Sequence, residues 1–226
     1  MNHFLLRYVA ATVTGNSFLH GTWMLHLIHP PFPPRYVDAT QVMTGYHFRT
    51  FMTNLLAIDP GNEFSGWVLM NQEDYSVLAK GNTPNSDLLQ MITSDNAEVQ
   101  LQYDNCTIEM IKSYGMSVGA TVFETCVWVG RFYEAVRLLS GIESGLVYRP
   151  VIKLHHCLSP KANDTTVRHA LIDRFAPHTT NGGKGSSKEP GWFYGFSKDI
   201  WAAYALAVYY TDIATGNTGN ITGTQS

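Results

Sequence analysis

The chain has 226 residues, of which 45% are apolar and 15% charged, a composition that excludes an intrinsically disordered protein. This length is enough for one α/β domain with a sizeable core plus extensions. The net charge of −3 conceals an asymmetry, because residues 52–148 hold four Lys and Arg against twelve Asp and Glu, whereas residues 149–198 hold eight against three. An acidic body with a basic C-terminal segment is typical of a metal site beside a surface for a polyanion, although ordinary solvated faces would give the same counts.

Cysteine spacing and hydropathy indicate the redox compartment of the protein and whether it is expected to associate with a membrane. Cys106, Cys126 and Cys157 include no close pair, which favours a reducing compartment and thiols buried as small apolar residues. No apolar run reaches the roughly 18 residues that a membrane-spanning helix needs, so no membrane partner is expected.

Residues 1–51 differ in character from the rest of the chain. They contain five of the nine histidines, a single acid, Asp38, and a proline cluster at 30–34, without sustained periodicity. The apolar stretch after Arg7 is broken at Gly15, which makes a poor signal peptide. We therefore expect Met52 to be the natural start and residues 1–51 to be an N-terminal extension. An added docking segment is the alternative.

From residue 54 onward the pattern becomes regular. Residues 55–59, 66–70 and 75–79 predict three strands with tight connections, an antiparallel meander. Residues 85–92 predict a short amphipathic helix, and residues 106–111 a fourth strand.

The second half of the chain predicts alternating helices and a strand. Thr121 is expected to cap a long helix with one apolar face, formed by Val122, Cys126, Val129, Tyr133, Val136 and Leu139. Residues 151–155 predict a fifth strand, residues 164–175 a helix, and residues 199–210 an alanine-rich last helix. The expected fold is α/β, a mixed five-stranded sheet with helices on both faces over residues 52–212, followed by a flexible tail at 213–226.

Three acids occupy positions that suit metal binding. Asp59 follows four apolar residues at the end of a buried strand, and nothing basic lies within twenty residues downstream. A buried carboxylate without a partner costs several kcal/mol, so a divalent cation is the economical partner. Glu109 lies within the fourth strand and Asp199 opens the last helix, each among apolar neighbours. Two hard cations about 4 Å apart, bound by such carboxylates, could activate water for phosphodiester hydrolysis.

Each acid also has an ordinary structural interpretation. Asp59 precedes Pro-Gly and could be a turn residue. Glu109 could lie on the exposed face of an edge strand, and Asp199 could favour the helix N-terminus through capping and the macrodipole. Their joint arrangement is what favours a shared site.

Several motifs in order resemble one nuclease family. Residues 58–61 (IDPG) with Ser65-Gly66, residues 107–110 (TIEM), and Asp199 followed by the alanine-rich stretch at 203–207 resemble the successive motifs of RuvC-type Holliday junction resolvases. Residues 108–111 (IEMI) with 123–128 (FETCVW), and residues 191–195 (GWFYG), resemble the phage and prophage members of this group. The resemblance covers about residues 54–212.

This resemblance implies a ribonuclease H-like fold and a homodimer that cuts four-way DNA junctions with two Mg²⁺ or Mn²⁺ ions per site, in a bacterial or phage-infected cytoplasm. By matching position, Asp59 would bridge both metals, Glu109 would bind one, and Asp199 would complete the shell. The family has two acids three residues apart on the last helix, whereas this chain has Ala202 at the second position. A water or a shifted acid would have to fill that place.

Basic residues in the C-terminal segment are candidates for DNA binding. Lys161 and Arg168 lie on or near the 164–175 helix, while Lys184 and Lys188 lie in the Gly/Ser/Lys stretch before Asp199. Neutralising phosphates there would make binding steeply dependent on salt. Scattered solubilising residues are the alternative interpretation.

Three other functions remain open at this point. The same fold could act on an RNA hybrid or a flap, or it could bind junctions without cutting them, given Ala202. A nucleotide-binding module of the actin and heat-shock-chaperone kind also uses an Asp-x-Gly loop after a first strand, but residues 52–226 contain no second such loop.

Overall fold

The computed structural model describes residues 53–112, 115 and 118–217. The chain divides into two units, Met1–Arg49 and Thr50–Ser226, and all described residues belong to the second. The predicted extension at 1–51 and most of the predicted tail therefore lie outside the described residues. Among the helices that are described, none is long and apolar enough to cross a membrane.

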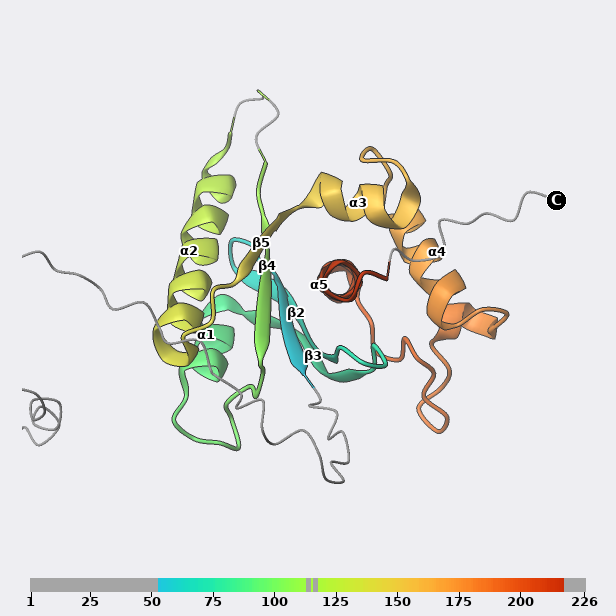
Figure 1. The fold of residues 1–226 in the computed structure, drawn as a ribbon, viewed down its shortest axis with the longest axis horizontal. Helices are drawn as coiled ribbons and strands as arrows, with labels where there is room; N and C mark the ends of the chain where they lie inside the picture. Colours follow the sequence, from blue (N-terminus) through green and yellow to red (C-terminus); the bar gives the residue numbers. More distant parts are fainter. Residues whose placement is uncertain (1–52, 113–114, 116–117, 218–226) are drawn as a thin grey trace, which may run out of the picture. The chain divides into compact units, whose positions relative to one another are not determined.

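Five strands form one mixed sheet in the order β3-β2-β1-β4-β5 (Figure 1). The strands are β1 (Asn54–Asp59), β2 (Phe64–Asn71), β3 (Val77–Pro84), β4 (Asn105–Met110) and β5 (Gly145–Tyr148). The first three strands form the predicted antiparallel meander, and β4 and β5 run parallel to β1. The carboxyl ends of β1, β4 and β5 consequently meet at one edge of the sheet.

Helices cover both faces of the sheet, as predicted (Figure 1). On one face lie α1 (Asn85–Thr93) and α2 (Ala120–Ser140). On the other face α5 (Lys198–Thr215) packs against β1 and β2, and α3 (Arg149–Cys157) and α4 (Asp164–Phe175) pack on α5 from outside. A long helix buried between a sheet and two further helices needs small side chains and apolar contacts on all sides.

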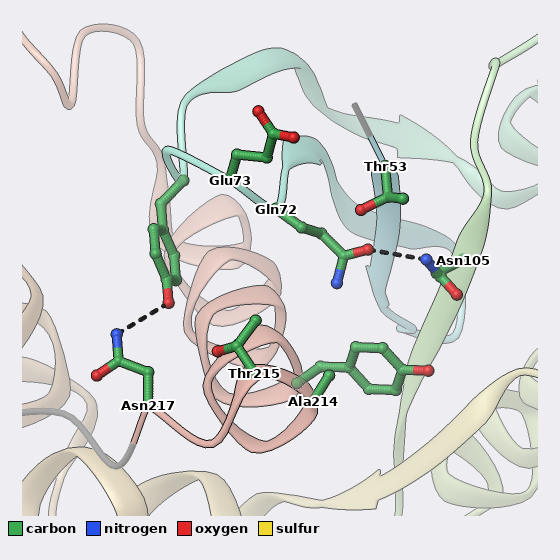
Figure 2. Close-up of a pocket in the computed structure, with 9 residues that line it drawn as sticks. Thr53, Gln72, Glu73, Asn105, Ala214, Thr215 and Asn217 are labelled. Carbon is green, nitrogen blue, oxygen red and sulfur yellow. Dashed lines mark hydrogen bonds between the residues drawn. The ribbon is translucent and has the colours of Figure 1, made fainter. Parts of the chain in front are cut away.

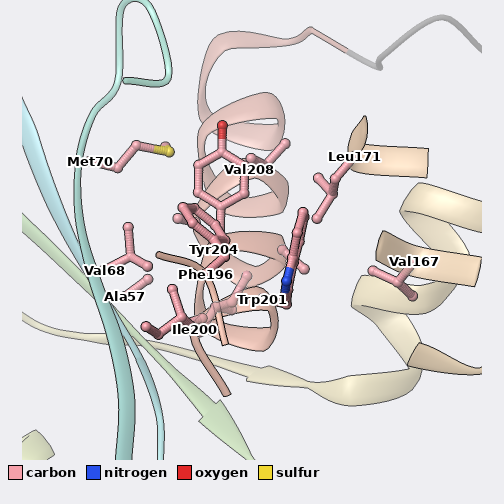
Figure 3. Close-up of a cluster of buried hydrophobic side chains, with 14 of the residues drawn as sticks. Ala57, Val68, Met70, Val167, Leu171, Phe196, Ile200, Trp201, Tyr204 and Val208 are labelled. Atoms are coloured by element: carbon pink, nitrogen blue, oxygen red, sulfur yellow. The ribbon is translucent and has the colours of Figure 1, made fainter. Parts of the chain in front are cut away.

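The alternation of side chains along β1 divides the core into two halves. Leu56 and Ile58 pack toward α1 and α2, whereas Leu55 and Ala57 pack toward α5. On α5 the residues from Ala203 to Val208 have no exposed surface, and the alanines among them let the helix approach the sheet closely. Figure 3 shows Tyr204 of this helix beside Val68 of the sheet. By the same alternation, Asp59 belongs to the α5 side.

The prediction of a fifth strand at residues 151–155 was wrong. That segment belongs to α3, and the fifth strand is β5, four residues long and immediately upstream. Pro150 lies in the first turn of α3, where its missing N–H and fixed φ suit a helix start. The apolar residues of 151–155 therefore lie on different sides of a helix: Ile152 is buried, whereas Val151 and Leu154 are exposed.

The predicted apolar face of α2 was partly wrong. Its buried residues are Val129, Phe132 and Val136, whereas Cys126 and Leu139 are exposed. Gly119, and not Thr121, is the N-cap. All three cysteines are free, and of these Cys106 is buried and Cys157 is partly buried.

A buried ion cluster ties α3, α4 and α5 together. Asp212 on α5 has no exposed side-chain surface, and it accepts two hydrogen bonds from Arg174 on α4, at 2.6 and 2.8 Å. His155 Nε2 on α3 lies 2.7 Å from the same carboxylate, and Tyr75 donates its hydroxyl to it at 2.8 Å. His156 contacts the Ala205 carbonyl oxygen at 2.9 Å, so the two adjacent histidines bind different partners across the α3–α5 contact.

Candidate metal centre

Two of the three predicted acids lie side by side at the carboxyl edge of the parallel strands. Ile58 of β1 pairs with Ile108 of β4, so the next residues, Asp59 and Glu109, are neighbours in the sheet. Both follow residues that face α2, so both side chains point to the α5 side. The carboxyl edge is where ligands of α/β sheets generally bind.

The third acid comes close because α5 begins against a glycine. Asp59 pairs with Gly66 across the β1–β2 ladder, and the backbone of Asp199 lies directly over Gly66. A Cβ on Gly66 would lie 2.8 Å from the Cβ of Asp199 and still closer to its carbonyl group. The absence of a side chain at residue 66 thus lets Asp199, in the first turn of α5, approach the end of β1.

Donors from the protein hold two of the acids, but not the third. Glu109 Oε2 accepts a hydrogen bond from Arg149 Nη1 at 2.9 Å, and Asp199 Oδ2 accepts one from Asn82 Nδ2 at 2.9 Å. Within the described part of the chain, the Asp59 carboxylate has neither a hydrogen bond nor an ion pair. Among residues 53–112, 115 and 118–217, no group of three or more His, Cys, Asp or Glu is arranged to hold a metal ion.

The electrostatics of Asp59 nevertheless fit a cation. Burial raises the pKa of Asp59 well above its ordinary value, and the charges of Glu109 and Asp199 raise it further, against the opposing charge of Arg149. Burial also raises the pKa of Glu109, although Arg149 opposes the shift. A hard divalent cation would offset both the burial and the mutual repulsion of these oxygens. Carboxylate oxygens are the ligand type of Mg²⁺ and Mn²⁺, but among the described residues the three acids are not arranged as a metal site.

Position 202 supplies no fourth acid, because Ala202 is an apolar residue within the buried part of α5. The structure brings two further charged residues to the site, Arg149 and Asp164, which were not among the predicted site residues. Arg149 Nη2 lies 2.8 Å from Asp164 Oδ1, so one guanidinium joins Glu109 to the start of α4. The sequence feature that could have identified Arg149 is the pair Arg149-Pro150. It marks the end of β5, at the same edge of the sheet as Glu109.

The predicted DNA-binding residues lie on the α4 side of the molecule. Lys161 is exposed between α3 and α4, and Lys188 is exposed in the turn closed by the Gly185–Pro190 bridge. Lys184 is partly buried beside the 3₁₀ turn Thr180–Gly183. Arg168 lies over the Trp201 ring at 5.0 Å, and its Nε is buried with no hydrogen-bond partner among the described residues.

A pocket of about 570 Å³ lies at the opposite edge of the sheet (Figure 2). Thr53 and Asn105 line it, and they mark the amino ends of β1 and β4. Asn105 donates to Gln72 at 2.8 Å across its floor. Since β1 has six residues at about 3.3 Å each, this pocket is roughly 20 Å from the carboxylates and contains none of the predicted site residues.

No protein-family model matches the chain, and no curated protein matches its sequence. Among solved structures, Thermus thermophilus RuvC is similar, with a TM-score of 0.51 and 12% identity over 73% of this chain and 97% of that chain. Thermus thermophilus RuvC in complex with a Holliday junction substrate is similar with a TM-score of 0.51 and 10% identity, over 74% and 98% of the two chains. At such identities the likeness shows the fold, and it confirms the predicted ribonuclease H-like α/β fold with its mixed five-stranded sheet.

Proposed function

We propose that this protein is a divalent-metal-dependent endonuclease that cuts branched DNA, with four-way junctions as its substrate. The observation that carries the proposal is the Asp59 carboxylate, which lies beside Glu109 and Asp199 at the carboxyl edge of the sheet without a donor from the described protein. The likeness to RuvC, one structure of which holds a Holliday junction substrate, supports the choice of substrate.

In this proposal Asp59, Glu109 and Asp199 hold Mg²⁺ or Mn²⁺. Such an ion, when bound, would supply a Lewis acid for activating a water and for stabilising the leaving oxygen of a phosphodiester. The three side chains would hold the ion, and Asn82 orients Asp199 through its 2.9 Å hydrogen bond. Because Asp59 lies at the end of a buried strand, its position is set by the β1–β2 and β1–β4 ladders and not by a loop.

The DNA strands follow the basic side of the molecule in this proposal. Lys161, Arg168, Lys184 and Lys188 neutralise phosphates, and Arg168 is pre-oriented by its contact with Trp201. The body of the domain toward α1 and α2 is acidic by composition, so the basic segment is where a polyanion is attracted.

A second copy of this chain covers the outer face of α2 in the proposed homodimer. Phe123, Val127 and Leu138 lie on one side of this helix and are 64%, 60% and 67% exposed. We call these three residues the α2 apolar stripe. A dimer that buries the stripe carries two metal centres, which suits paired cuts in a symmetric junction.

The decisive assay follows a labelled four-way junction and a matched linear duplex with Mg²⁺ or with EDTA. The wild-type protein is expected to nick the junction symmetrically, only with metal, and to spare the duplex. Asp59→Asn should cost at least about 10²-fold in rate and leave junction binding intact or tighter, because a negative charge near phosphate is removed. Asp87→Asn, an exposed acid of α1, is the matched control.

A junction-binding protein without nuclease activity is the second candidate, and Ala202 is the observation that favours it. Position 202 lacks the acid that the resembled family has there, and it is buried. Tight, metal-independent binding of the junction without any cleavage would support this candidate and contradict the nuclease. Cleavage of the duplex at the same rate would contradict junction selectivity.

A further inference from the structure

The pocket at the amino edge of the sheet carries a negative charge. Nine described residues line it, and of these Glu73 alone is charged. The Glu73 backbone N–H donates to Asn71, but its carboxylate has no hydrogen bond or ion pair with another described residue. Arg174 lies over the Tyr75 ring, but both of its Nη atoms donate to Asp212, so its positive charge is already offset. The lining therefore favours a positively charged ligand.

The C-terminal end of α5 adds to this preference. Ala214 and Thr215 line the pocket in the last turn of this 18-residue helix. The carbonyl groups at such an end have no partners within the helix, and the helix dipole gives them a partial negative charge. A basic side chain in the last turn often offsets that charge, but the last turn of α5 contains none. A cation in the pocket would provide the positive charge that the helix end lacks.

The amide side chains of the pocket present oxygen atoms to a ligand. Asn105 Nδ2 donates to Gln72 at 2.8 Å, and Gln72 Nε2 donates to Thr211 at 3.3 Å. Asn217 Nδ2 donates to the Tyr75 hydroxyl at 3.3 Å. Each amide nitrogen thus has an acceptor, whereas Oδ1 of Asn105 and Oδ1 of Asn217 accept no hydrogen bond from a described residue. A ligand that suits this lining must bring N–H donors.

The volume of about 570 Å³ and the spread of these oxygens do not suit a single metal ion. One carboxylate lines the pocket, and residues 53–112, 115 and 118–217 contain no group of three His, Cys, Asp or Glu that could hold a metal. Asn105 and Asn217 lie on opposite sides of the pocket, with Ala214 and Thr215 between them (Figure 2). Ala214 and the Tyr210 ring add apolar surface. A ligand that fits has separated N–H groups joined by apolar segments.

We propose that this pocket binds a linear aliphatic polyamine, a chain of ammonium groups joined by methylene segments. One ammonium group lies beside the Glu73 carboxylate, and others donate to the oxygens of Asn105 and Asn217. The methylene segments pack on Tyr210 and Ala214, where the aromatic ring also attracts a cation. The proposal does not depend on nuclease activity, because the pocket is roughly 20 Å from the acids of the proposed metal centre and shares no residue with them.

Calorimetric titration of the full-length protein with spermidine, at an ionic strength of about 0.15 M, tests the proposal. Wild type is expected to bind one spermidine per chain in a saturable manner, and inorganic phosphate should not compete. Glu73→Gln should bind spermidine about 3- to 5-fold more weakly, because it removes the one charge of the lining.

A matched pair of variants adds the same charge at neighbouring positions of α5. Ala214 lines the pocket, whereas Ile213 is 59% exposed and does not line it. Ala214→Lys places an ammonium group in the pocket and is expected to weaken spermidine binding at least about 10-fold. Ile213→Lys should bind within about 2-fold of wild type, since exposed charges outside the pocket are screened. Circular dichroism checks the folding of each variant.

Spermidine binding that does not saturate, or that Ala214→Lys leaves unchanged, would overturn the proposal. Equal weakening in Ile213→Lys and Ala214→Lys would also overturn it, because net charge would then explain the effect. Displacement of spermidine by an equal concentration of Mg²⁺ would show a site for any cation and would contradict a polyamine site. Where Ala214→Lys does not fold, Glu73→Gln decides: unchanged spermidine affinity overturns the proposal, and weakened affinity supports it.

Discussion

Asp199 occupies the space that a side chain on Gly66 would need. A Cβ on Gly66 would meet the Asp199 backbone and would lie 2.8 Å from the Asp199 Cβ. Because Gly66 pairs with Asp59, this close approach is what joins the start of α5 to the end of β1. The proposed metal centre therefore depends on a residue with no side chain.

Gly66→Ala is expected to push the first turn of α5 away from the sheet. Overpacking of this kind costs about 1–3 kcal/mol of unfolding free energy, which denaturant titration measures. The variant should also lose Mn²⁺ affinity. In Gly119→Ala the new Cβ would meet nothing within 4 Å, so that control should cost less than about 1 kcal/mol and keep the metal. Wild-type Mn²⁺ affinity in Gly66→Ala would show that Asp199 does not need this approach.

The exposed lysines beside α4 should govern the salt dependence of DNA binding. Removing both Lys161 and Lys188 by alanine substitution is expected to weaken junction binding and to reduce the slope of log K against log salt by about 0.9 for each phosphate that is no longer neutralised. Fluorescence anisotropy at several salt concentrations measures the slope. Arg137→Gln, on α2, should leave it unchanged. An unaltered slope in the double variant would assign the phosphate contacts to other residues.

The α2 apolar stripe should hold the proposed homodimer together. Val127→Asp places a charge among the apolar residues of the stripe and is expected to give a monomer by light scattering after size-exclusion chromatography. Val99 is 41% exposed and lies outside α2, so Val99→Asp is the control and should remain dimeric. A dimer that persists in Val127→Asp would exclude the stripe as the interface.

His156 should make the protein sensitive to mild acid. Burial lowers the pKa of His156 to about 4, although its contact with the Ala205 carbonyl opposes the shift. The unfolded chain, with a histidine pKa near 6.5, takes up a proton first as the pH falls, so stability is lost between about pH 6.5 and pH 4. At about 1.4 kcal/mol per pKa unit, the loss reaches about 3 kcal/mol.

Urea unfolding at several pH values measures this effect. His156→Gln keeps a side-chain donor for Ala205 but does not titrate, so its stability should fall less steeply over this window. His169→Gln, an exposed histidine on α4, should behave like wild type. Identical slopes in wild type and His156→Gln would contradict the assignment.

The central strands could be predicted from sequence because their side chains alternate between two apolar layers. Leu55 to Ile58 are all buried, which makes the run easy to recognise, and the Pro-Gly break places Asp59 at its end. The alanines of α5 likewise predicted a closely packed helix. The elements at the centre of the sheet thus follow from local pattern.

The edge of the sheet could not be predicted in the same way. β5 has only four residues, two of them exposed, so its pattern is weak. The stronger alternation of residues 151–155 belongs instead to α3, where packing on α5 decides the structure. Because the fifth strand was predicted in the wrong place, Arg149 was not recognised as a neighbour of Glu109. The contact between Arg149 and Glu109 spans 40 residues and depends on where β5 ends. The absence of a fourth acid at Ala202 was visible in the sequence, but the guanidinium near Glu109 was not.

The most direct test of the proposed metal site is the position of Mn²⁺ in a crystal of the wild-type protein, located by its anomalous scattering. We expect a peak within bonding distance of a carboxylate oxygen of Asp59, with Glu109 and Asp199 beside it, and no such peak in Asp59→Asn. Sites elsewhere on the molecule, with the Asp59 carboxylate left without an ion at saturating Mn²⁺, would contradict it.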